Sequence, residues 1–61
     1  MKLVSEIKLQ CKNLEELTEY LNIFQKYLAK FVFKHKDFNY SLESFKEQEQ
    51  LYLKVKVCRK N

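Results

Sequence analysis

The chain has 61 residues and a formal net charge of +4, with 46% hydrophobic and 15% aromatic residues. A chain of this length forms at most one domain, and a domain of this size buries only about 60% of the surface that its unfolded chain exposes. The apolar content excludes a disordered tail, and the absence of Gly and Pro excludes a P-loop, a dinucleotide-binding glycine turn and a nucleophile elbow.

The first predicted element is a strand over residues 3–11, where apolar and polar side chains alternate. The apolar face comprises Leu3, Ile7, Leu9 and Cys11, together with Ser5. Val4 is the one exception to the alternation. Alternation with a period of two indicates a strand that buries one of its faces.

A helix is predicted next, because apolar residues recur at alternating spacings of three and four. They are Leu14, Leu17, Leu21, Phe24, Leu28 and Phe31. Asn13 followed by Glu16 fits an N-cap with a capping-box partner. Glutamates in the first turns and lysines in the last turns are what the helix dipole favours. We expect the helix to end between Phe33 and Lys36.

Two further strands are predicted in the C-terminal half. One starts near Phe38 and places Phe38, Tyr40 and Leu42 on one face; the other covers residues 51–58 and points Leu51, Leu53, Val55 and Val57 inward. Because the tight two-residue hairpin turns depend on Gly, we expect residues 46–50 to form a longer polar loop. An alternative makes residues 41–50 a short helix capped by Ser41, with Leu42 and Phe45 inward, but we favour the hairpin.

These elements together predict an α+β fold. Residues 1–61 form a single βαββ domain in which one amphipathic helix packs across a three-stranded sheet. We expect the last strand to be the central one.

The predicted helix carries more apolar surface than such a sheet covers. Tyr20, Ile23, Tyr27 and Phe31 widen its apolar arc to about 180°, against about 100° for an ordinary surface helix. Because a chain this short also needs additional burial, we predict a homodimer that uses these four residues or an edge strand. The alternative is a monomer in which a chain terminus folds back over these four residues, or in which the tyrosines keep their hydroxyls in water.

The opposite face of the predicted sheet collects lysines. If the strand phases hold, this face contains Lys2, Lys8, Lys12, Lys54, Lys56 and Lys60, with Tyr52 among them and Glu6 and Glu43 as its only acids. Lysines two residues apart on a strand stand about 6.6 Å apart, close to the spacing of phosphates along one strand. We therefore predict nucleic-acid binding by these lysines and Tyr52. The alternative is a solvated face whose lysines protect the sheet edges.

Catalytic chemistry has little support in this sequence. His35 lies near the predicted helix end, where capping explains it. Cys11 and Cys58 fall on opposite faces, so we expect neither a disulfide nor a tetrahedral zinc site with His35 and Asp37. We therefore predict no enzyme activity, no cofactor and no metal.

The compartment is predicted from the cysteines and from the hydropathy. Residues 1–12 contain no uninterrupted apolar stretch, and no segment approaches the roughly 18 apolar residues of a membrane span. Two widely spaced cysteines in a Lys-rich chain lead us to expect reduced thiols in the cytoplasm, and no membrane partner.

The distribution of charge completes the functional hypothesis. Residues 26–36 carry four lysines and no acid, and residues 54–60 carry three lysines and Arg59 with no acid, which suggests an anionic partner. The sequence therefore predicts a small homodimeric protein that binds nucleic acid or a nucleoprotein through its Lys-rich sheet face. The alternative is an inhibitor or adaptor, of a kind that phages encode, that blocks a host protein.

Overall fold

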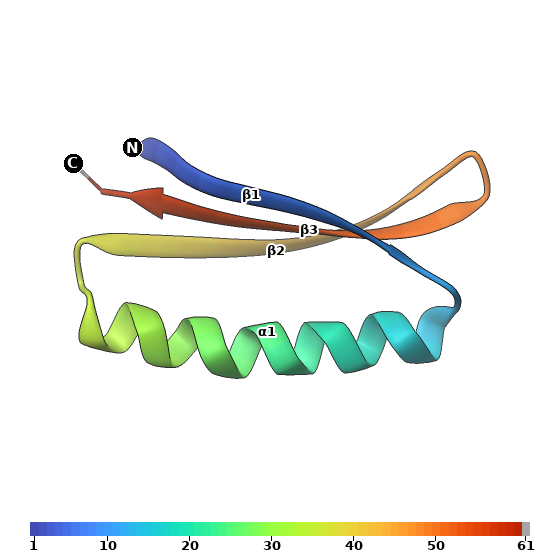
Figure 1. The fold of residues 1–61 in the computed structure, drawn as a ribbon, viewed down its shortest axis with the longest axis horizontal. Helices are drawn as coiled ribbons and strands as arrows, with labels where there is room; N and C mark the ends of the chain where they lie inside the picture. The colour runs from blue at the N-terminus through green and yellow to red at the C-terminus, as the bar shows by residue number, and fades with distance from the viewer. Residues whose placement is uncertain (61) are drawn as a thin grey trace.

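The computed structural model describes residues 1–60, which form one helix and three strands. The elements in chain order are β1 (Lys2–Cys11), α1 (Leu14–Lys34), β2 (Phe38–Glu47) and β3 (Gln50–Arg59). The strands form an antiparallel sheet in the order β1-β3-β2, and α1 lies along one of its faces (Figure 1). The predicted βαββ fold is therefore confirmed, with β3 at the centre.

The helix begins and ends where the sequence predicts. The Asn13 side chain accepts a hydrogen bond from the Glu16 backbone N–H at 2.9 Å, and Glu16 Oε1 accepts one from the Lys12 N–H at 3.1 Å. Each bond satisfies a backbone donor at or just before the first turn of α1. The last helical residue is Lys34, and the His35 N–H closes the end on the Phe31 carbonyl at 2.8 Å.

The strand registers confirm the predicted faces of β2 and β3. Leu42 pairs with Val55 and Tyr40 pairs with Val57, so these side chains share the face that meets α1. The buried core comprises Cys11, Leu17, Leu53 and Val55. Partly buried apolar residues surround it, most of them from α1: Tyr20, Leu21, Phe24, Leu28, Leu42 and Leu51.

The start of β1 departs from the predicted phase. Leu3 pairs with Cys58 and Ser5 pairs with Val57, so Val4 is an extra residue that forms a β-bulge. A bulge of one residue shifts every residue before it to the other face of the sheet. Leu3, which we expected to point inward, therefore lies opposite Cys58 on the face away from α1.

The hairpin between β2 and β3 is confirmed, but the predicted loop over residues 46–50 is wrong. Glu47 pairs directly with Gln50, which leaves a two-residue turn. Gln48 and Glu49 both have positive φ, 51° and 66°, which is the backbone of a type I′ turn. Because a Cβ disfavours this conformation, the turn is held by the two ten-residue strands that it connects.

The helix crosses the sheet diagonally. It starts beside the end of β1 and stops beside the start of β2, and these two strands are opposite edges of the sheet (Figure 1). Along β1, only Leu9 and Cys11 are covered, and residues 2–8 are exposed. One side of α1 and the N-terminal half of β1 therefore remain open to solvent.

Candidate nucleic-acid interface and exposed helix flank

The face of the sheet away from α1, called the outer face below, carries one row of side chains from each strand. β3 contributes Tyr52, Lys54 and Lys56. Lys8 pairs with Lys54, and Glu6 pairs with Lys56, so β1 places its Lys8 on this face as predicted. These lysines form its basic centre.

An aromatic pair lies beside these lysines. Phe45 pairs with Tyr52 across β2 and β3, and their rings stack with centroids 5.4 Å apart and planes 21° apart. Lys8 Nζ lies 4.5 Å from the Tyr52 centroid, and Lys54 Nζ lies 5.4 Å from that of Phe45. Cations at these distances are attracted by the negative faces of the rings. The outer face thus combines two aromatic rings with two ammonium groups.

Sequence reasoning missed Phe45 as a member of this site. Alternation from Phe38, Tyr40 and Leu42 continues through Ser44, and it therefore assigns Phe45 to the outer face. The predicted faces of this strand ended near Leu42, and only the alternative short helix placed Phe45, with its side chain inward.

The outer face holds more acid than we expected. Glu47 joins Glu6 and Glu43 there, and its Oε1 lies 3.6 Å from Lys8 Nζ. Glu6 Oε1 lies 3.8 Å from Lys56 Nζ, and Glu43 is the cross-strand partner of Lys54. All these lysines have an acidic neighbour, so the potential of this face is lower than its lysines alone imply.

Three predicted lysines lie away from this centre. The prediction that Lys2 lies on the outer face is wrong. The bulge at Val4 shifts the register, so that Lys2 pairs with Arg59 and lies on the face toward α1. Lys12 lies in the connection between β1 and α1. Lys60 follows β3, where its backbone N–H donates to the Asp37 carbonyl at 2.7 Å. Of the six predicted lysines, Lys8, Lys54 and Lys56 therefore lie within the strands of the outer face.

The predicted dimer residues occupy one side of α1, called the helix flank below: Tyr20, Ile23, Tyr27 and Phe31. Tyr20 is half-buried against the core. Ile23 is 48% exposed, Tyr27 71% and Phe31 37%. On the helix-facing side of β1, Ile7 is also 44% exposed. The structure thus leaves Ile23 and Tyr27 of the helix flank largely open to solvent.

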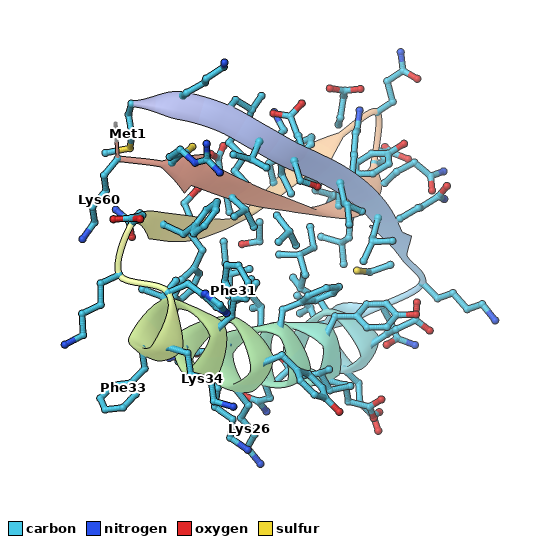
Figure 2. All side chains as sticks on the ribbon, turned by 60° about the vertical axis from the view of Figure 1, so that its left-hand side comes forward. Met1, Lys26, Phe31, Phe33, Lys34 and Lys60 are labelled. Carbon is cyan, nitrogen blue, oxygen red and sulfur yellow. The ribbon has the colours of Figure 1, made fainter. Side chains whose placement is uncertain are left out.

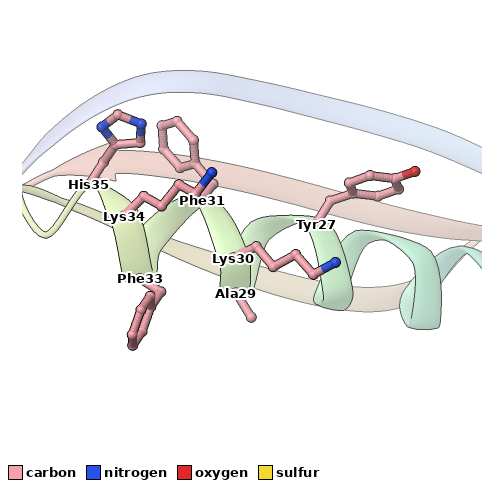
Figure 3. A pocket seen from close by; sticks show the side chains of 7 residues that line it. All are labelled: Tyr27, Ala29, Lys30, Phe31, Phe33, Lys34 and His35. Carbon is pink, nitrogen blue, oxygen red and sulfur yellow. The ribbon is translucent and has the colours of Figure 1, made fainter.

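The C-terminal end of α1 is apolar and basic. A shallow hollow of about 510 Å³ is lined by Tyr27, Ala29, Lys30, Phe31, Phe33, Lys34 and His35. Tyr27, Phe31 and His35 point toward the sheet and Phe33 points away from it (Figure 3). Phe33 and Lys26 project from the helix into solvent, and Phe33 does so toward the end of the domain where Met1 and Lys60 lie (Figure 2). Phe33 is 78% exposed.

The remaining reactive groups are separated from one another. Cys11 is buried against the core and Cys58 is half-buried on the outer face, and both are free thiols. Burial, with a smaller contribution from the nearby Glu16 carboxylate, raises the pKa of Cys11. His35 is exposed, and its ring lies beside that of Phe31 in a tilted arrangement, with ring centroids 4.8 Å apart.

Within residues 1–60, no group of three or more His, Cys, Asp or Glu side chains is arranged to hold a metal ion. In the same part of the chain, no helix combines the length and the hydrophobicity that a bilayer span requires.

Comparison of this chain with protein-family models, with curated proteins and with solved structures finds no match.

Proposed function

We propose that this protein is a non-enzymatic, homodimeric binding protein that holds single-stranded nucleic acid, alone or within a nucleoprotein, against the outer face of its sheet. The observation that carries the proposal is the stacked pair Phe45–Tyr52 with Lys8 and Lys54 over its rings. Aromatic rings on a sheet stack unpaired bases, and neighbouring lysines contact the phosphates. This arrangement suits single strands because their bases are free to stack.

Replacement of a lysine ammonium by a nucleic-acid base on the face of these rings is favourable in free energy. An exposed cation–π contact contributes about 0.5–1 kcal/mol, whereas base–aromatic stacking contributes about 1–3 kcal/mol per base. An ammonium that leaves the ring is still able to reach a phosphate. Glu47 and Glu6 oppose this step, since Lys8 and Lys56 give up their carboxylate partners when they bind phosphate.

The test is titration of a fluorescent single-stranded oligonucleotide at several salt concentrations. Three phosphate contacts, from Lys8, Lys54 and Lys56, predict a slope of about −2 for log K against log salt. Lys54→Glu/Lys56→Glu should remove most of the binding. The control variant Lys26→Glu/Lys36→Glu changes the net charge by the same amount, but its two positions lie in α1 and in the turn after it. This variant should retain most of the binding. Equal loss in both variants, or no binding by the wild type, contradicts the proposal.

The homodimer is supported by the helix flank. Ile23 and Tyr27 expose apolar surface beside the half of β1 that α1 leaves open. Burial of this surface against a second copy supplies the stabilisation that one small core lacks. Sedimentation should show a dimer at micromolar concentration. Ile23→Lys should shift the protein toward monomer. The control Asn22→Lys, at the neighbouring solvent-facing position, should not. A wild type that stays monomeric at hundreds of micromolar contradicts the dimer.

A second candidate function is an inhibitor or adaptor that blocks another protein. Phe33, which is 78% exposed beside the apolar hollow at the end of α1, favours it, because exposed aromatic side chains often anchor protein interfaces. This function predicts no oligonucleotide binding at 150 mM salt, the order of physiological ionic strength. It also predicts a specific protein partner whose binding Phe33→Ala weakens.

A further inference from the structure

The charged residues that border the helix flank differ between its two ends. Glu16 and Glu19 lie in the first half of α1, and Lys30 and Lys34 lie in the last turns. At 100° per residue, these four charged residues, Ile23 and Tyr27 fall within an arc of about 80° on the helix surface. One strip along α1 is therefore acidic at its start, apolar in its middle and basic at its end.

We propose that two copies of this chain pack their α1 helices antiparallel along this strip, with a two-fold axis beside position 25. Residues at equal distances on either side of that position then meet across the axis. Ile23 meets the partner's Tyr27, and Glu16 meets the partner's Lys34. Glu19 comes next to the partner's Lys30.

Charge complementarity selects this orientation over the parallel one. In a parallel pair, Glu19 would meet its own copy and Lys30 would meet its own copy, and like charges across an interface are strongly unfavourable. In the antiparallel pair, each glutamate meets a lysine, and the helix dipoles also oppose each other favourably. Affinity comes from burial of Ile23 and Tyr27, and the charges decide the orientation.

Glu19 and Lys30 are the residues of choice for a test. Both are exposed, and neither takes part in a salt bridge among residues 1–60. Glu16 is less suitable because its carboxylate caps the helix start through the Lys12 N–H. A substitution there would change the stability of α1 as well as the interface.

The experiment is a charge exchange followed by sedimentation equilibrium at low salt. Glu19→Lys alone and Lys30→Glu alone should each raise the dimer Kd about tenfold, because each introduces a like-charge contact on both sides of the axis. The double variant Glu19→Lys/Lys30→Glu should return to within about threefold of the wild type. An equimolar mixture of the two single variants should form a heterodimer preferentially. Lys36→Glu, which changes the charge equally outside the strip, should leave the Kd unchanged.

This inference rests on the homodimer proposed above and not on nucleic-acid binding. If Ile23→Lys dissociates the dimer while the single charge variants do not, the dimer survives and the antiparallel arrangement is wrong. A double variant that fails to recover also overturns it, as does a Lys36→Glu effect equal to that of Lys30→Glu. A monomeric wild type overturns both the dimer and its geometry, and leaves the outer-face proposal to its own titration.

Discussion

Phe45 of β2 and Tyr52 of β3 are direct cross-strand partners, and their rings stack 5.4 Å apart on the solvent side of the sheet. Directly opposed aromatic residues stabilise an antiparallel pair by about 0.2–1 kcal/mol relative to alanines. The pair thus has a structural contribution as well as the binding role proposed here. Substitutions that remove the aromatic ring but keep an apolar side chain distinguish the structural contribution from the binding role.

The first prediction concerns the rings as a binding surface. Phe45→Ala and Tyr52→Ala should each weaken oligonucleotide binding by about 1–3 kcal/mol if a base stacks on the ring. Tyr52→Phe keeps the ring and should bind like the wild type, whereas Tyr52→Leu keeps apolar contact and should bind like Tyr52→Ala. Fluorescence anisotropy with a poly-dT oligonucleotide measures all four. Full binding by Tyr52→Leu would show that the ring is not a stacking surface.

The faces of β2 and β3 were predictable because burial enforces their alternation. Leu53 and Val55 lie inside a covered sheet, and a slip of one residue would expose them. The ends of α1 were predictable for a local reason: Asn13 and Glu16 satisfy backbone donors within one turn. Signals that act over a few residues, or that burial reinforces, therefore sufficed for most of the fold.

The start of β1 was not predictable in the same way. Residues 2–8 are exposed, so burial does not enforce a phase there, and the bulge at Val4 reverses the faces of Lys2 and Leu3. The pair of adjacent apolar residues Leu3–Val4 was the only sign of it in the sequence. Because the predicted basic face included Lys2, this single extra residue also changed the candidate site.

The second prediction concerns the turn of the hairpin. Gln48 and Glu49 have positive φ, which costs a residue with a Cβ roughly 1 kcal/mol or more. Glu49→Gly should therefore raise the free energy of unfolding by about 1 kcal/mol, despite the larger entropy of Gly in the unfolded chain. Glu47→Gly, in the strand just before the turn, should lower it by about 0.5–1 kcal/mol. Urea denaturation measures both, and destabilisation by Glu49→Gly would show that the turn has another conformation.

The third prediction concerns the core. Leu53 is 0% exposed at the centre of β3, and Leu53→Ala should lower the free energy of unfolding by about 2–5 kcal/mol through lost burial and a cavity. Since small domains lie near the low end of about 5–15 kcal/mol of stability, a large fraction of this variant should be unfolded. Leu3→Ala, at a 52% exposed position on the outer face, should change stability by less than about 1 kcal/mol. Circular dichroism during thermal unfolding compares them, and equal losses of stability would contradict the exposed position of Leu3.

The fourth prediction concerns the two thiols. Cys11 pairs with Leu51 on the helix side, whereas Cys58 lies opposite Leu3 on the outer face. Leu51 and Cys58 are seven residue steps apart along β3, which corresponds to about 23 Å, far beyond the roughly 7 Å between Cα atoms that a disulfide allows. A thiol reagent in excess should therefore modify Cys58 quickly and Cys11 only slowly. Peptide mapping identifies the modified residue, and an unreduced monomer lighter by two hydrogens would contradict these strand faces.

The buried thiol should also make stability depend on pH. Burial, and secondarily Glu16, raises the pKa of Cys11 in the folded protein, so this thiol keeps its proton above about pH 8.5, where an unfolded thiol loses it. The unfolded state then binds fewer protons than the folded state, and the free energy of unfolding falls as pH rises through that range. Cys11→Ala removes this contribution while the tyrosines and lysines stay the same. Urea denaturation between pH 7.5 and pH 9.5 brackets the ordinary thiol pKa of about 8.5. Over this range the wild type should lose stability more steeply than Cys11→Ala. Parallel curves of stability against pH would mean that Cys11 titrates like an exposed thiol.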